Sequence, residues 1–251
     1  MFTSRLQGPW RYRDGLVVLL GFFLIYAAFS AAHMLIVRYT IGFAAHVGSA
    51  GRPLPGFLLL SQWLKAIALL TAVWWLALQR HQLSWRDLGL VRCSRNWLVL
   101  AVVVAVAGFA LRLLLAKVMV AALPDWARFM ASPYGWFDAS WPLMLALMLT
   151  TIVITPVAEE IFFRGFLFQW MATHRPVWLA MLISSLIFGV SHLMPAQAIS
   201  TALMSLLIVL LYLGSRSLWP CIVCHVVNNA LGMLLGMAAV QGLLPAALTP
   251  P

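Results

Sequence analysis

The sequence predicts an all-α fold, a polytopic transmembrane helical bundle of about seven or eight spanning helices. Of its 251 residues, 64% are hydrophobic and only 9% are charged, and the mean hydropathy is +0.98. A soluble domain carries about 25% charged residues, and about 20 consecutive apolar residues cross the hydrocarbon core of a bilayer. Seven stretches approach that length, and the longer ones leave room for an eighth helix: 15–37, 57–78, 97–123, 142–168, 177–193, 197–213 and 218–240.

The basic residues indicate how the bundle is oriented. The net charge of +10 comes from residues scattered over short loops, which fits the retention of Arg and Lys in the cytoplasm and not a nucleic-acid-binding face. Arginines gather in residues 1–14 and 79–96, whereas loop 124–141 is rich in aromatic residues typical of a membrane interface. We therefore expect an integral protein of the bacterial inner membrane, with the N-terminus in the cytoplasm.

The domain organisation follows from the same pattern. Residues 1–14 are expected to form a cytoplasmic tail, residues 15–240 a single transmembrane helical domain, and residues 241–251 a C-terminal tail. The residues suited to chemistry are concentrated in 142–240, so the functional core is expected there.

The two glutamates of the chain lie side by side in the fourth apolar stretch, at Glu159 and Glu160. A carboxylate inside a bilayer costs about 2.5–3.5 kcal/mol even on the gentler insertion scale, so such residues usually mark function. Glu160 and Arg164 are spaced i,i+4 and can pair on one helix face, while Glu159 is rotated by about 100°. We expect Arg164 to hold Glu160 and Glu159 to stay available as a general base. A structural ion cluster is the alternative.

Two further polar groups follow on later stretches. His192 ends the fifth stretch, and His225 and Asn229 lie four residues apart near the start of the last one. The i,i+4 spacing predicts that these last two converge on one point, where an amide donor suits the stabilisation of an oxyanion. A lone membrane histidine is more often a packing residue, so the argument depends on the combination of all these groups.

Three motifs in this order resemble the CPBP family of intramembrane proteases: Glu159-Glu160-x-x-x-Arg164, Phe188-x-x-x-His192 and His225-x-x-x-Asn229. That family includes the type II CAAX prenyl endopeptidases and bacteriocin-processing or bacteriocin-immunity proteins. The resemblance implies hydrolysis of a peptide bond in a membrane-associated peptide or protein. It implies that Glu159 and His192 activate the water, that His225 and Asn229 steady the oxyanion, and that Glu160 and Arg164 support the site.

The resemblance leaves the role of a metal open. Glu159, His192 and His225 could ligate zinc, but a Glu-Glu-Arg cluster places a cation beside those ligands, so we favour a mechanism without a cofactor. Two other functions are compatible with the same residues. One is a non-catalytic immunity or scaffold protein, and the other is an ion-coupled transporter that uses the Glu/His cluster.

Cations inside the second and third stretches also need partners. Lys117 lies near an end and is expected to extend its ammonium to the interface. Lys65 and Arg112 lie deeper, and each is expected to meet either a substrate carboxylate or an unidentified acid or carbonyl. Depth raises a further condition, because 1.5 Å per residue puts His192 deeper than Glu159. The site therefore requires the fifth helix to be offset, or its following turn to be sunk within the protein.

Overall fold

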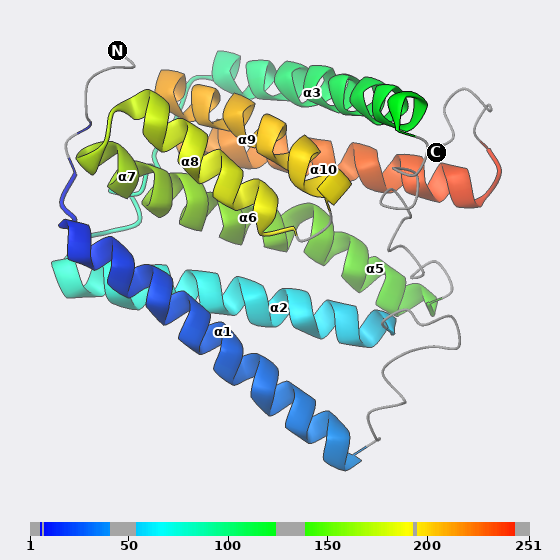
Figure 1. Ribbon diagram of the computed structural model, residues 1–251, viewed down its shortest axis with the longest axis horizontal. Coiled ribbons are helices and arrows are strands. Elements are labelled where there is room, and N and C mark those ends of the chain that lie inside the picture. The colour runs from blue at the N-terminus through cyan, green and yellow to red at the C-terminus, as the bar shows by residue number, and fades with distance from the viewer. Residues whose placement is uncertain (1–5, 7, 41–53, 124–138, 193–194, 244–251) are drawn as a thin grey trace.

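The computed structural model describes residues 6, 8–40, 54–123, 139–192 and 195–243, and all regular structure within them is helical. The all-α prediction is confirmed (Figure 1). The helices are α1 Tyr12–Thr40, α2 Pro55–Ala72, α3 Arg95–Ala122, α5 Trp141–Leu149, α6 Thr155–Glu160, α7 Gln169–His174, α8 Val177–Val190, α9 Pro195–Ser215 and α10 Leu218–Val240.

Several of these elements join into longer helices. π-helical segments at 150–154 and 161–168 connect α5, α6 and α7 into one helix of 34 residues, Trp141–His174, which extends six residues beyond the predicted stretch. Likewise α2 continues through a π-helical segment to His81. Among the described residues, six helices are long and apolar enough to span a membrane, as a polytopic bundle requires.

Helix α8 is shorter than predicted and ends part-way along the bundle (Figure 1). It has 14 residues and ends at Val190 rather than at 193. At 1.5 Å per residue it is about 21 Å long, less than the roughly 30 Å of a hydrocarbon core. Helices α8 and α9 form a hairpin, and α8 ends short of the side at which α5 begins and α10 ends (Figure 1). This is the offset that a site containing His192 requires.

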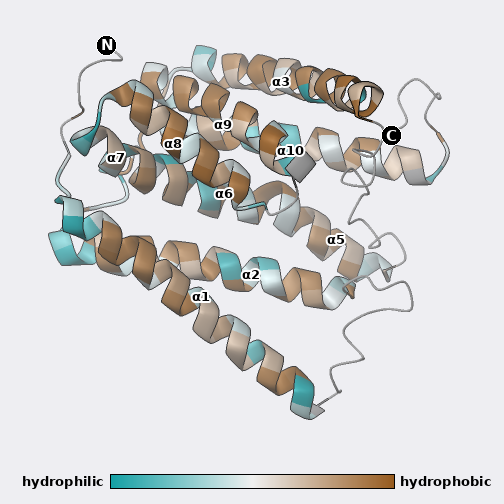
Figure 2. Cartoon of the chain, in the orientation of Figure 1, coloured by the Kyte–Doolittle hydropathy of each residue, from teal (hydrophilic) through white to brown (hydrophobic). Residues whose placement is uncertain are grey.

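The bundle presents an apolar exterior with polar positions in its interior. Large side chains such as Phe23 on α1 and Val103 on α3 are more than half exposed, as expected of surfaces that face lipid tails. In Figure 2, hydrophilic positions interrupt the apolar pattern of α2 and α6 in the middle of the bundle. Those two helices pack against each other, so their polar residues meet in the interior.

Two segments outside the spanning helices pack onto the bundle. Trp10, predicted to lie in a tail, is buried, stacks edge-on against Phe166 and donates to the carbonyl oxygen of Ala77 at 3.0 Å. In the loop after α2, the pKa of Asp87 is lowered by hydrogen bonds from the backbone and hydroxyl of Ser84. This loop then accepts a bond from the first residue of α10 through the carbonyl of Gly89. Most of the predicted aromatic loop 124–141 and of the tail 241–251 lies outside the described residues.

Candidate active site

Helix α6 holds Glu159 and Glu160 between two wide helical turns. Pro156 has no N–H to donate to the preceding turn, and the preceding segment is π-helical, with the N–H of Thr155 bonded to the carbonyl of Thr150. Insertions of this kind occur often at functional sites because they change which face a side chain occupies. Both glutamates are buried here, with 2% and 0% of their surface exposed.

Glu160 binds two partners through one oxygen. Its Oε1 accepts from Arg164 Nη1 at 2.8 Å and from His225 Nδ1 at 2.7 Å, so the predicted pairing of Glu160 with Arg164 is present. Arg164 also donates to the hydroxyl of Ser205 at 2.8 Å and lies over the ring of Phe188 at 4.6 Å. Glu160 Oε2 is buried and has no hydrogen-bond partner among the described residues. Glu160 is thus fixed, and it fixes His225 in turn.

Glu159, which was expected to stay available as a general base, has a cation as its partner. Lys65 on α2 donates to its Oε1 at 2.6 Å, and His225 Nε2 lies 3.8 Å from its Oε2. The alternative in which Lys65 meets an acid is therefore correct, and Glu159 is that acid. The Lys65 side chain is 25% exposed, against 3% for Glu159. Glu159 is therefore held by a cation whose side chain is more exposed than its own.

The contact between α2 and the α5–α7 helix is polar over several turns. Thr151 and Thr155 both donate to Gln62 Oε1, at 3.0 and 3.3 Å, and Trp63 Nε1 donates to the hydroxyl of Thr150 at 3.1 Å. Thr151, Thr155 and Glu159 are spaced four residues apart and thus share one helix face. These hydrogen bonds hold the two helices in register, and the row of polar contacts ends at the Lys65–Glu159 pair.

His192 joins the cluster through Phe188. The Phe188 ring lies 5.0 Å from the His192 ring and 5.7 Å from the His225 ring, edge-on in both cases. Glu159 and His192 are also within electrostatic reach of each other. His192 Nδ1 pairs with the Phe188 carbonyl at 2.9 Å. A carbonyl only accepts, so Nδ1 carries the proton and a neutral His192 keeps Nε2 as an acceptor. The same reasoning applies to His225 opposite Glu160.

Asn229 binds a different partner from His225, although the spacing predicted that they converge. Its Nδ2 donates to the carbonyl of Thr151 at 3.0 Å. In a π-helical turn the Thr151 carbonyl would accept from the N–H of residue 156, but that residue is proline and has no N–H. Asn229 thus supplies a hydrogen bond that the backbone cannot make. One of its two N–H groups is used in this way, and the other is not committed to this contact.

The charges of this cluster do not fit a zinc ion. Glu159, His192 and His225 were the ligands considered for such an ion, but the Lys65 ammonium lies 2.6 Å from Glu159 and Arg164 pairs with Glu160. Within the described ranges, no three His, Cys, Asp or Glu side chains are grouped as a metal site would need. We therefore derive no step through a metal.

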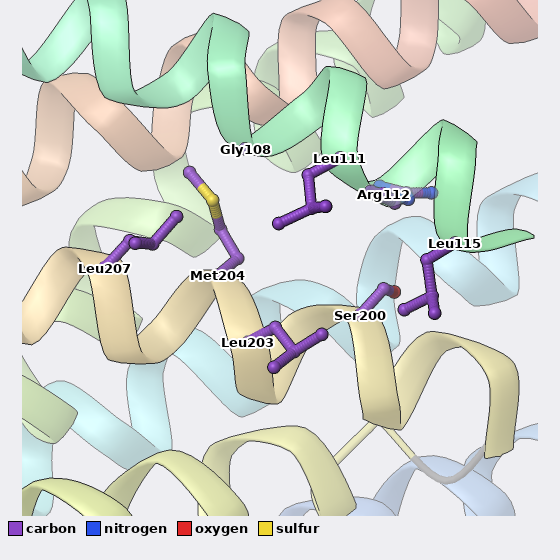
Figure 3. Close-up of a pocket in the computed structure, with 8 residues that line it drawn as sticks. All are labelled: Gly108, Leu111, Arg112, Leu115, Ser200, Leu203, Met204 and Leu207. Carbon is purple, nitrogen blue, oxygen red and sulfur yellow. The ribbon is translucent and has the colours of Figure 1, made fainter.

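The other deep cation lies apart from this cluster. Arg112 on α3 contacts the ring of Phe109 at 5.8 Å and lines a small pocket between α3 and α9 (Figure 3). The pocket has a volume of about 20 Å³, enough for about one water molecule. None of the eight residues that line it belongs to the glutamate cluster. Arg112 therefore serves as a comparison for Lys65 and Arg164.

Sequence reasoning overlooked three contributors to the cluster. Lys65 was recognised as an unusual cation but not as the partner of Glu159, which is 94 residues away. Ser205 lies on α9 in an apolar run and carried no signal. Phe188 was part of a motif, yet its role as the surface against which Arg164 and both histidines pack follows only from the fold.

The fold and the cluster together define a polytopic helical membrane protein with a buried acid–imidazole site. Comparison with known families shows a match of residues 140–231 to the type II CAAX prenyl endopeptidase Rce1-like family. The predicted family is thus confirmed, and this part of the chain is that of a CPBP family intramembrane protease. The matched segment contains α5 to α9 and most of α10. Comparisons with curated proteins and with solved structures found no match.

Proposed function

We propose that this protein is an intramembrane endopeptidase that hydrolyses a peptide bond of a membrane-associated substrate with a water activated by Glu159 and His192. The match to a CAAX-type endopeptidase family supports the general class. The observation that carries the proposal is the position of Glu159, a buried carboxylate beside two imidazoles in the middle of an apolar bundle. A buried carboxylate in an apolar bundle usually marks function, and a carboxylate beside an imidazole can accept the proton of a water.

The proposed roles follow from the contacts of each group. Glu159 accepts the proton of the attacking water, and His192, whose Nε2 is free to accept, orients that water. Glu160 and Arg164 hold His225 in place. The uncommitted N–H of Asn229 then acts on the tetrahedral oxyanion, together with the Nε2–H that His225 presents when it is protonated. Because a helix shields its own peptide bonds, the substrate is expected to present an unwound segment or a chain terminus.

We propose a class of substrate, a membrane-associated peptide or protein. A prenylated CAAX-type peptide and a bacteriocin-type peptide both fit an endopeptidase of this family, and the bilayer would deliver either one. The protein is proposed to act in the bacterial inner membrane with its N-terminus in the cytoplasm, as its basic loops predict.

A proteolysis assay tests this function. The purified protein in detergent is incubated with a panel of prenylated and unprenylated peptides, and the products are identified by mass. We expect cleavage by the wild type, a fall of at least about 10³-fold in the Glu159→Ala variant, and little change in Arg112→Gln, which alters a membrane cation outside the site. Cleavage that survives Glu159→Ala, or a folded wild type that cleaves none of the peptides, would overturn the proposal.

A further inference from the structure

We infer that Lys65 is a further catalytic residue, which binds the oxyanion of the tetrahedral intermediate after Glu159 has taken up a proton. The inference rests on the proposed function. It assigns a role to a residue that lies outside the three motifs and outside the matched segment 140–231.

The contacts of Lys65 leave it hydrogen-bonding capacity. An ammonium has three N–H donors, and among the described residues Glu159 Oε1 is the hydrogen-bond partner of Nζ. The side chain is 25% exposed, whereas those of Glu160, Arg164 and His225 are at most 7% exposed. Of the two cations in the cluster, Lys65 and Arg164, Lys65 is therefore the one that an incoming substrate can approach.

The charge balance of the reaction gives Lys65 a second partner. At rest the cluster holds two carboxylates, Glu159 and Glu160, each paired with a cation, Lys65 or Arg164. Glu159 takes a proton from water while the water oxygen forms a bond to the carbonyl carbon and the carbonyl π electrons move to its oxygen. The negative charge thus leaves Glu159 and appears on the oxyanion, and the total charge does not change.

Lys65 is then an ammonium beside a neutral acid in a low-dielectric site. Its attraction to Glu159 falls at the moment when an oxyanion forms nearby, so a preorganised donor becomes available where charge develops. On collapse of the intermediate the carbonyl re-forms, the C–N bond breaks, and the proton on Glu159 passes to the leaving nitrogen. Glu159 is again a carboxylate, and Lys65 returns to it.

The Lys65 ammonium lies close enough to Glu159 to reach the oxyanion. A water bonded to Glu159 Oε1 at about 2.8 Å lies at most about 5.4 Å from Lys65 Nζ, and less in any bent arrangement. The oxyanion is the carbonyl oxygen bonded to the carbon that this water attacks. A small rotation of the flexible Lys65 side chain therefore brings its ammonium to the oxyanion. The other donors are more committed, because Asn229 uses one of its two N–H groups on the Thr151 carbonyl and His225 donates from Nδ1 to Glu160.

Steady-state kinetics give the first test, with Lys65→Met, Lys65→Arg and the control Arg112→Gln. We expect Lys65→Met to lower kcat about 10²–10³-fold, with the KM changed much less, because the lost interaction forms only in the transition state. Lys65→Arg should retain more activity than Lys65→Met, and Arg112→Gln should resemble the wild type. Equal losses in Lys65→Met and Lys65→Arg, or a change in KM alone, would contradict the assignment.

A binding measurement separates this role from mere positioning of Glu159. The probe is a phosphonate analogue of the peptide that the wild type cleaves, which carries a tetrahedral anion at the scissile position. In Glu159→Gln, where the carboxylate is gone, Lys65 should bind the anion, and adding Lys65→Met should weaken the affinity about 10²-fold. Unequal affinity supports the inference, and equal affinity refutes it while the proposed peptidase function stands. A wild type without peptidase activity would instead remove both.

Discussion

Replacing Arg164 by methionine removes a guanidinium that makes three kinds of buried contact. It donates to Glu160 at 2.8 Å and to Ser205 at 2.8 Å, and it lies 4.6 Å from the centre of the Phe188 ring. A hydrogen bond to a charged group contributes about 1.5–3 kcal/mol, and a desolvated cation–π contact about 2 kcal/mol. The larger effect is that Glu160, with 0% of its side chain exposed, loses its counter-ion.

Breaking a buried ion pair from one side costs about 3–5 kcal/mol, because the remaining charge is left uncompensated. We therefore expect Arg164→Met to lower the free energy of unfolding by about that amount. Glu160→Gln removes the opposite charge, so the double variant should be less destabilised than the two single effects added together. The expected coupling is about 1–3 kcal/mol.

The chain contains its own probe for this measurement. Cys221 and Cys224 are fully buried, while Cys93 is partly exposed. In a Cys93→Ser background, a maleimide fluorophore should label the protein only as it unfolds, which gives a melting curve in detergent. Arg112→Met is the matched control, because its cation–π contact with Phe109 is worth only about 0.5–1 kcal/mol at a partly exposed site. If Arg164→Met melted like Arg112→Met, or if the double variant showed simple additivity, the reasoning would be refuted.

Two further predictions concern backbone packing around the cluster. Asn229→Ala should lower the free energy of unfolding by about 1–3 kcal/mol, because it leaves the Thr151 carbonyl without its donor. The Pro156→Ala substitution restores a backbone N–H at residue 156, so Asn229→Ala should cost less stability in that background. An equal cost in both backgrounds would contradict this account. Gly189→Ala should cost about 1–3 kcal/mol and most of the peptidase activity, because the added Cβ would collide with the carbonyl oxygen of Ala198 and force α8 and α9 apart. Thermal melting and peptide cleavage check this against Gly56→Ala, whose added Cβ would meet no atom within 4 Å, and equal behaviour of the two glycine variants would count against it.

The fold class and most helix bounds could be read from composition and length. Apolar stretches of about 20 residues have few alternatives in a bilayer, since every backbone polar group there must be satisfied within the segment. The helices α1, α3, α9 and α10, and α2 with its continuation to His81, lie within three residues of the predicted stretches. The larger difference is in the α5–α7 helix, which extends six residues beyond its stretch, and α8 ends three residues before the end of its own.

Within the site, the predictable part was local. The Glu160–Arg164 pair follows from i,i+4 spacing on one helix, which needs no knowledge of neighbouring elements. The same spacing places His225 and Asn229 on one face of α10, but it could not predict their partners. Each of them binds a residue of the α5–α7 helix, Glu160 for His225 and Thr151 for Asn229.

The sequence by itself determined that this protein is a helical membrane bundle, and it predicted a site at Glu159 and Glu160 and the protease family that residues 140–231 match. Only the tertiary structure decided that Lys65 neutralises Glu159 and that Trp10 belongs to the core. The physical reason is that helical periodicity and hydropathy act along the chain, whereas the pairing of charges in a low-dielectric interior depends on which helices pack together. Lys65 and Glu159 are 94 residues apart, and their contact exists only because α2 packs against α6.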